Sequence, residues 1–381
     1  MNTRTIQLCA GLAALSFSLA AAAGDELVIA QIASVTNIAS ASAAKANNAG
    51  LQAYIDSVNA RGGVGGRNIK IVLRDDDVNA ATMVRMTKEL VADKEVLALV
   101  NFLNTAGLSE LSKQNLPEQA GIAMIAPVQG SKQIVGANNF FPFRSGYDDE
   151  VVALVKEARD TQKKSLAIFY FRSAFGPSMS QLAQNEAKNQ GLNVVANVGI
   201  DSTPANFDAN MKNAVAEIAK ANPDAIFLIC AGRYGTEFVK LIRDTPAAAA
   251  QLYSISVLYA DDVVKAAGVK KAHGLVIAQA TPFPFALTSP LVYEYQRVMK
   301  QYAPNTPLSF SSLEGYIGGK ITVEALKRAG SNPTRQKVLA ALNNFGEWDL
   351  GGVYVNYGGK GRFGWRGVDL TIVASSGKLV H

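Results

Sequence analysis

The sequence predicts an α/β protein with two lobes, each built around a mainly parallel sheet. Short apolar segments alternate with amphipathic segments of helical period along most of the 381 residues, a pattern typical of parallel sheets covered by helices. The alternation forms two successive series that change over near residues 141–146. Without a leader of 23 residues the chain keeps about 358, which exceeds what one core usually supports.

The candidate strands are continuous apolar runs. In the first series they are residues 27–32, 69–73, 96–100 and 122–125. In the second series they are residues 166–171, 194–198, 225–229, 252–257 and 275–278. Runs of this length without polar alternation favour strands that are buried on both faces.

The candidate helices show apolar residues at the helical spacing. Leu51, Tyr54, Ile55 and Val58 fall at i, i+3, i+4 and i+7, which predicts one buried helix face. Comparable patterns occur within 151–158 and 211–218. After the proline-rich segment 281–285, which cannot continue a regular ladder, helices are expected at 291–302, 312–329 and 334–344, followed by a β-rich tail from 351 to 380. We therefore expect the chain to cross between the lobes more than once.

Residues 1–23 predict a cleaved secretion signal. Arg4 is their only charge, an apolar stretch follows from Leu8, and three alanines at 21–23 suit the cleavage site. The stretch is shorter than the ~20 apolar residues that span a bilayer, which argues against a membrane anchor. Cys9 lies too early for a lipoprotein. We expect a soluble protein exported to the periplasm.

Composition excludes several classes of protein. Lys and Arg number 37 against 31 for Asp and Glu, a net charge of +6, but no basic run stands out, so nucleic-acid binding is not predicted. Removal of the leader leaves Cys230 without a disulfide partner, and its place at the end of an apolar strand favours a small buried side chain.

The glycine run at 62–66 resembles a phosphate-binding loop only superficially. Such a loop requires a strand, then glycines, then the N-terminus of a helix. Here a helix precedes the glycines and a strand follows them. The run therefore predicts a helix C-cap and turn, where positive φ favours glycine, and no nucleotide or other cofactor is expected.

Other chemically capable residues also have ordinary structural interpretations. Asp75, Asp76 and Asp77 could form a metal site, but no partner histidine or second acidic cluster is evident, so we expect them to cap the strand end and the next helix. His273 accompanies neither an H-E-x-x-H nor a G-x-S-x-G motif. We expect no metal and no enzyme, although carboxylate catalysis by a titratable pair in a cleft needs no motif.

Polar loops follow many of the predicted strands. They are residues 34–37, 101–105, 127–131, 172–176, 232–235 and 258–259. Ligands of open α/β sheets bind beyond the carboxyl ends of strands. Hydroxyls, amides and helix N-termini placed there can bind a carboxylate. A ligand cleft between the two lobes is therefore expected.

Four segments in order resemble a known family. They are the helix, A-x-G-G-hydrophobic-x-G-[RK] turn and D-D strand end at 50–84, G-I-A-M-I-A-P at 121–127, F-P-F-R-S at 141–145 and N-P-D-A-I-F at 222–227. Over nearly all of the mature chain the sequence is similar to the periplasmic binding proteins of ABC importers, of the leucine/isoleucine/valine-binding type. The resemblance implies two Rossmann-like lobes with parallel central sheets joined by three hinge crossovers, the type I periplasmic binding protein fold. One lobe would hold residues 24–145 and 280–351, the other 146–279 and 352–381.

The resemblance also implies which residues bind ligand. The family's pocket positions fall on Thr105, on Gln129, Gly130 and Ser131, on Phe175, and on Tyr234 with Arg233 beside it. The polar loops add Asn37, Asn104, Arg172 and Tyr259. We expect Thr105 and Ser131 to hold a ligand carboxylate, and Phe175 and Tyr234 to cover its apolar body. Lobe closure around the ligand would then signal occupancy to a membrane permease.

Two departures from the family pattern leave the ligand open. Residues 34–42 lack the usual G-P and aromatic residue. Segment 254–258 lacks the acid that amino-acid binders offer to the ligand's ammonium, although Asp261 or Asp262 could reach it, and Arg172 and Arg233 could serve a second acidic group. The ligand is expected to be an amino acid, of branched-chain type, or an aromatic or aliphatic acid without an amino group. A monomer partnering a permease is the main expectation, and a sensor component of the same fold is the alternative.

Overall fold

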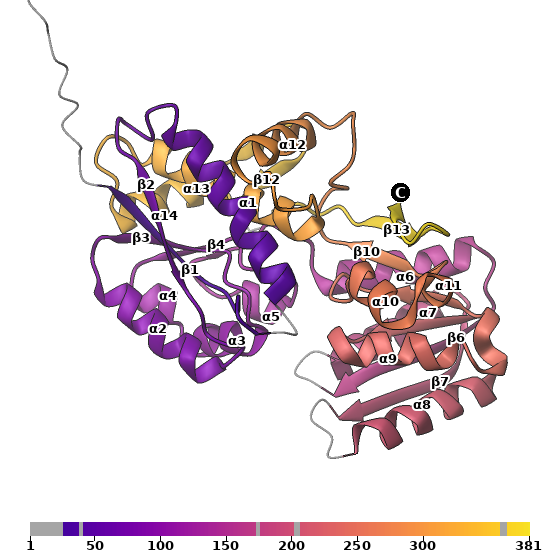
Figure 1. Ribbon diagram of the computed structural model, residues 1–381. Coiled ribbons are helices and arrows are strands. Elements are labelled where there is room, and N and C mark those ends of the chain that lie inside the picture. Colours follow the sequence, from indigo (N-terminus) through magenta and orange to yellow (C-terminus); the bar gives the residue numbers. More distant parts are fainter. Residues whose placement is uncertain (1–25, 38–40, 173–175, 202–205, 359–363) are drawn as a thin grey trace, which may run out of the picture.

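The computed structural model describes residues 26–37, 41–172, 176–201, 206–358 and 364–381. These residues form two α/β lobes side by side (Figure 1). The first lobe contains a five-stranded sheet and the second a seven-stranded sheet. Among the described residues, no helix is long and apolar enough to cross a membrane.

The first lobe is a parallel sheet covered by helices on both faces. Its strand order is β2-β1-β3-β4-β5, formed by β1 (Leu27–Ile32), β2 (Ile69–Arg74), β3 (Val96–Val100), β4 (Ala123–Ile125) and β5 (Phe140–Phe141). One face packs against α1 (Ala41–Asn59), α12 (Pro290–Tyr302), α13 (Phe310–Arg328) and α14 (Arg335–Asn343). The other packs against α2 (Ala80–Ala92), α3 (Thr105–Lys113), α4 (Leu116–Gln119) and α5 (Lys132–Val135).

The second lobe repeats this plan with an antiparallel edge. Its order is β14-β13-β10-β9-β8-β6-β7, formed by β6 (Ser165–Arg172), β7 (Asn193–Asp201), β8 (Ala225–Ile229), β9 (Gln251–Ser254), β10 (Val276–Gln279), β13 (Asp369–Val373) and β14 (Leu379–Val380). The five strands β7, β6, β8, β9 and β10 are mutually parallel, whereas β13 pairs antiparallel with both β10 and β14. The fold predicted from the sequence is thus confirmed, and the β-rich tail supplies two edge strands.

Helices cover both faces of this second sheet as well. One face packs against α6 (Tyr147–Asp160) and α7 (Gly176–Asn189). The other packs against α8 (Phe207–Ala221), α9 (Gly232–Ile242), a 3₁₀ turn at Pro246–Ala249, α10 (Ala260–Ala267) and α11 (Val269–Ala272). Buried Cys230 belongs to this second core.

The chain passes between the lobes three times, after β5, after β10 and before β13. The third crossing lies later than expected. The hairpin of β11 (Glu347–Asp349) and β12 (Tyr354–Asn356) spans the predicted boundary at 351–352. Val355 and Tyr357 pack into the first lobe's core, because the tight turn sends the chain back into that lobe. Residues 352–357 therefore belong to the first lobe.

The glycine run forms the predicted turn between α1 and β2. Gly62, Gly63, Gly65 and Gly66 all have positive φ, between 60° and 93°. At Gly63 a Cβ atom would lie 1.9 Å from the carbonyl oxygen of Arg67, so the position also has no room for a side chain. The glycine run therefore forms a tight turn that reverses the chain direction.

Helices α1 and α13 pack with their backbones in contact. A Cβ atom on Gly50 would lie 1.9 Å from the carbonyl oxygen of Ser312, and one on Gly315 would lie 1.9 Å from that of Asn47. Tyr54 and Tyr316 meet edge to face, with ring centroids 4.9 Å apart. This close packing fixes the N-terminal turns of both helices, which face the second lobe.

Candidate functional site

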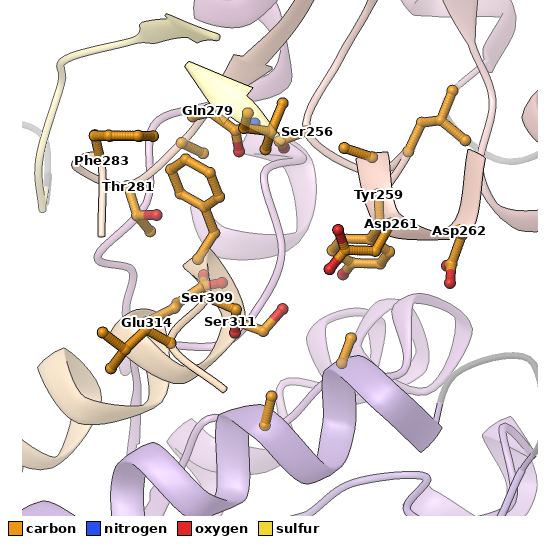
Figure 2. A pocket seen from close by; sticks show the side chains of 18 of the residues that line it. Ser256, Tyr259, Asp261, Asp262, Gln279, Thr281, Phe283, Ser309, Ser311 and Glu314 are labelled. Atoms are coloured by element: carbon orange, nitrogen blue, oxygen red, sulfur yellow. The ribbon is translucent and has the colours of Figure 1, made fainter. Parts of the chain in front are cut away.

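A cavity of about 470 Å³ lies between the lobes, within the usual size range of small-molecule sites. The first lobe contributes the N-terminal turns of α1 and α13, and the second contributes the segment from Ser256 to the first turn of α10. The first crossover contributes Arg144, the second contributes Ala280, Thr281, Phe283 and Phe285, and residues 377–379 near the C-terminus also line the cavity. In Figure 2, Ser309, Ser311 and Glu314 lie on the α13 side, while Ser256, Tyr259 and Asp262 lie on the second-lobe side.

Tyr259 is the one predicted site residue, among those the structure describes, that lines this cavity. It precedes α10 and is 39% exposed. Phe175 lies outside the described residues. The other predicted residues lie at the ends of β1, β3, β4, β6 and β8, where the sequence predicted polar loops.

The structure brings the predicted residues of the first lobe together around Gln129. This side chain is fully buried. Its Nε2 donates to Oγ1 of Thr105 over 2.9 Å, and its Oε1 accepts from the backbone N–H of Ser131 over 2.9 Å. Gly130 packs so closely on the ring of Tyr147 that a Cβ atom would lie 2.6 Å from it. Thr105 begins α3, whose N-terminal amides favour an anion.

The acidic cluster after β2 holds the first loop in place. Asp76 is fully buried and accepts hydrogen bonds from Oγ of Ser34 (2.5 Å) and Nδ2 of Asn104 (2.7 Å). The amide oxygen of Asn104 accepts from the backbone N–H of Gly107, so both ends of this predicted site residue are engaged in the first lobe. Asn37 likewise donates to Asp77 over 3.1 Å.

The expectation that these aspartates cap the next helix was wrong. The N-cap of α2 is Asn79, whose side chain accepts from the N–H of Thr82 over 2.9 Å. Asp75 instead accepts from both the backbone N–H and the hydroxyl of Thr36, and these hydrogen bonds lower the pKa of its carboxyl against the opposing effect of desolvation. Among the residues that the structure describes, no group of three His, Cys, Asp or Glu could hold a metal ion.

The second lobe presents an aromatic surface at the ends of β6 and β8. The ring of Tyr234 stacks on Phe171 at 5.6 Å and meets Phe207 edge to face at 5.2 Å. The guanidinium of Arg233 lies 4.1 Å over the ring of Phe207 and 3.1 Å from Asp208. The arrowheads of β6 and β7 point toward the first lobe (Figure 1).

Arg172 lies at the end of β6, and its Nη1 is 3.8 Å from Oδ1 of Asp201 at the end of β7. Both side chains are more than half exposed. Such an ion pair contributes little to stability. Arg172 and Arg233, the two arginines considered for a second acidic group of the ligand, thus each already have an aspartate neighbour.

A buried cluster between the lobes was not predicted. Arg144 in the first crossover donates to Oγ of Ser256 over 2.5 Å. Glu150 on α6 accepts from the backbone N–H of Ser256 (2.6 Å) and from its hydroxyl (2.8 Å). The guanidinium nitrogens of Arg144 lie 3.7 Å from Oε1 of Glu314 on α13 and 3.9 Å from Oε1 of Glu150. The cluster therefore links the first crossover to both lobes.

Burial dominates the acid–base behaviour of this cluster. Desolvation raises the pKa of Glu150 to about 7, although Arg144 and the hydrogen bonds from Ser256 oppose it. Desolvation also raises the pKa of Glu314, again against the attraction of Arg144. Neither glutamate could be singled out from the sequence, because each lies within an ordinary helical pattern.

The comparisons with known proteins agree with this architecture. The family model described as "Periplasmic binding protein" matches residues 27–377. The Leu/Ile/Val-binding protein homolog 7 of Brucella melitensis is 23% identical over 301 residues, which cover 73% of this chain and 71% of that protein. The Leu/Ile/Val-binding protein of Escherichia coli is 26% identical over 256 residues, 65% of either chain.

Solved structures show the same fold. A substrate-binding periplasmic protein from Ralstonia solanacearum superposes with a TM-score of 0.84 at 26% identity, covering 93% of this chain and 99% of that one. A branched chain amino acid ABC transporter structure from Thermus thermophilus with bound valine gives a TM-score of 0.80 at 18% identity, covering 94% and 95%. The chain therefore belongs to the periplasmic binding protein family, with the type I fold of its leucine/isoleucine/valine-binding members.

Proposed function

We propose that this protein captures a small carboxylate ligand between its lobes in the periplasm and delivers it to the permease of an ABC importer. The observation that carries the proposal is the cavity whose walls come from both lobes and from two crossovers. A ligand that contacts both lobes at once favours the closed arrangement over the open one. Relatives named for binding leucine, isoleucine and valine support an amino acid or a related acid.

Thr105, Gln129 and Ser131 do not line this cavity; we assign them to the ligand carboxylate as the first lobe's contribution once the lobes have closed on the ligand. Buried Gln129 fixes both neighbours, and neutral hydroxyl and amide donors can hold an anion without a buried countercharge. Tyr234 and Phe175 of the second lobe are assigned to the apolar body of the ligand. Phe283, Phe285 and Phe310 line the cavity and favour an apolar side chain.

Binding rather than catalysis accounts for these features. The relatives are named as binding proteins, and export through the signal peptide at 1–23 is part of the proposal. That leader lies outside the described residues. A monomer is proposed, since closure needs both lobes of one chain.

A thermal-shift screen with amino acids and with aromatic and aliphatic acids tests the function. A ligand at 100 times its Kd should stabilise the protein by about 2.7 kcal/mol. Thr105→Ala and Tyr234→Ala should each weaken binding of the hit, while Tyr293→Ala, an exposed tyrosine on α12, should not. No response to any small carboxylate would reject the ligand class. Unchanged affinity in both site variants would reject the site.

A further inference from the structure

The buried cluster of Arg144, Glu150 and Glu314 connects both lobes to the first crossover. Glu314 lies on α13 of the first lobe, and Glu150 lies on α6 of the second lobe. Arg144, in the crossover, lies between them. All three side chains are no more than 9% exposed. Movement of one lobe against the other therefore changes the distances within a group of charges that water barely reaches.

The cluster carries more negative than positive charge when both carboxyls are ionised. Nη1 of Arg144 lies 3.7 Å from Oε1 of Glu314, and Nη2 lies 3.9 Å from Oε1 of Glu150. Both distances exceed those of hydrogen bonds, and among the described residues the buried Nε–H of Arg144 has no acceptor. One cation thus faces two carboxylates without being hydrogen-bonded to either. Two carboxylates that share one site favour the binding of a proton by one of them.

Glu150 is the carboxyl that is placed to bind this proton. Burial raises its pKa to about 7, against the opposing attraction of Arg144 and the hydrogen bonds from Ser256. The Ser256 hydroxyl donates to Oε1 of Glu150 over 2.8 Å and accepts from Arg144. A hydroxyl can rotate to accept two hydrogen bonds, so a protonated Glu150 can donate to it while Oε2 still accepts from the backbone N–H of Ser256. The proton is accommodated without leaving either side chain unpaired.

Other groups around the cluster do not supply the missing positive charge. Burial raises the pKa of Tyr147, which precedes Glu150 on α6, and of Tyr259, which precedes α10, so both phenols are uncharged near pH 7. Nearby charges are Asp148 and Asp149, which pair with Lys132, and Asp261, Asp262, Lys265 and Lys378 beside the cavity. Both Lys265 and Lys378 are exposed. The excess negative charge therefore stays within the cluster.

We propose that the cluster of Arg144, Glu150 and Glu314 is a proton-controlled latch between the lobes, in which uptake of one proton favours the closed arrangement and its release favours the open one. With both carboxyls ionised, the excess negative charge is shared by residues of opposite lobes, and water that enters as the lobes separate stabilises it. With Glu150 protonated, the remaining pair of Arg144 and Glu314 is neutral and no longer opposes closure. The latch acts on the lobes themselves, so it operates without a ligand.

The test follows the distance between the lobes in the ligand-free mature protein. Nitroxide labels at Lys113→Cys on α3 and Lys212→Cys on α8 report this distance by double electron–electron resonance, because both positions are exposed and lie in different lobes. The native Cys230 is buried. A difference of one pKa unit between the two arrangements corresponds to about a tenfold change in their ratio, so the open-to-closed ratio should rise by about tenfold from pH ~5.5 to pH ~8.5.

Two variants remove the bound proton's effect in different ways. Glu150→Gln offers Ser256 one acceptor and one donor, as the protonated carboxyl does, so its distances at pH ~8.5 should match those of the wild-type protein at pH ~5.5. Glu314→Gln leaves one carboxylate for one guanidinium, and its distances should not change over this pH range. Glu157→Gln, two turns from Glu150 on α6, is the matched control and should respond to pH as the wild-type protein does.

Three results would overturn the latch. The first is a wild-type distance distribution that is the same at both pH values. The second is a pH response in Glu150→Gln and Glu314→Gln that equals the wild-type response. The third is loss of the response in Glu157→Gln as well, which would assign it to α6 in general. Because no ligand is added, each result leaves the proposed capture of a carboxylate to be decided by the thermal-shift screen.

Discussion

Replacing Gly315 by alanine tests the close packing of α1 on α13. The new Cβ atom would lie 1.9 Å from the backbone oxygen of Asn47. Contacts of Cβ below 3.0 Å are essentially never found, so the helices must separate by at least 1.1 Å, the difference between the two distances. A backbone oxygen cannot rotate away as a side chain can, and the strain therefore falls on the whole helix pair.

The magnitude follows from two opposing effects. Overpacking of this kind typically costs about 1–3 kcal/mol, occasionally more, and the direct backbone clash puts Gly315→Ala at the upper end. Because alanine has a higher helix propensity than glycine, the same substitution also stabilises the helix by about 1 kcal/mol. We expect Gly315→Ala to lower the free energy of unfolding by about 2 kcal/mol. The cavity should distort as well, because Ala46, beside Asn47, lines it.

Gly319→Ala is the matched control, one turn further along the same helix. Its Cβ atom would meet side-chain atoms of Leu51 and Tyr54 at 3.2 Å, and side chains can shift by a few tenths of an ångström. The propensity gain is the same, so the net effect should lie between zero and about 1 kcal/mol of stabilisation. Urea unfolding followed by circular dichroism measures both. Equal midpoints for the two variants would refute the argument from backbone contact.

Two other predictions concern buried acids. The pKa of Glu150 is raised to about 7 in the folded protein, so the stability that its bound proton contributes is fully present below pH ~4.5 and is lost as the pH rises through ~7. Relative to Glu150→Gln, the free energy of unfolding of the wild-type protein should fall by up to ~3 kcal/mol between pH 5 and 8, as measured by urea titrations. Parallel pH profiles for the two proteins would contradict this. Asp76→Ala removes the carboxylate that accepts hydrogen bonds from Ser34 and Asn104 and should lower the free energy of unfolding by about 3 kcal/mol. The same change at the partly exposed Asp75 should cost less than about 1 kcal/mol, and similar melting temperatures for the two variants would show that the buried bonds matter little.

Much of the fold could be predicted because its strands are continuous apolar runs. The predicted bounds of β1, β3 and β8 match the structure to the residue. The strand predicted at 252–257 ends at Ser254 instead, because the following segment leaves the sheet and lines the cavity with Ser256. An apolar pattern indicates burial rather than strand conformation, and Ile255 and Leu258 are buried although neither belongs to a strand.

The site was less predictable because its polar contacts are distant in sequence. The loop residues Thr105, Gln129 and Ser131 could be proposed since parallel strands end at one edge of a sheet, and the structure does bring them together. The ion pair of Arg144 and Glu314 joins residues far apart in the chain. Neither helical period nor local motif carries information about such a pair, and only the assembled lobes reveal it.

The three crossings impose an order on folding. One face of the first sheet is covered by α12, α13 and α14, which are made after the whole parallel part of the second lobe. During synthesis the N-terminal third of the chain therefore cannot complete its hydrophobic core, because α1 packs most closely against α13, which is made much later. For a chain that we propose is exported, this delay is useful: the first lobe remains incomplete, and so easier to thread through a membrane, until its C-terminal helices have been made.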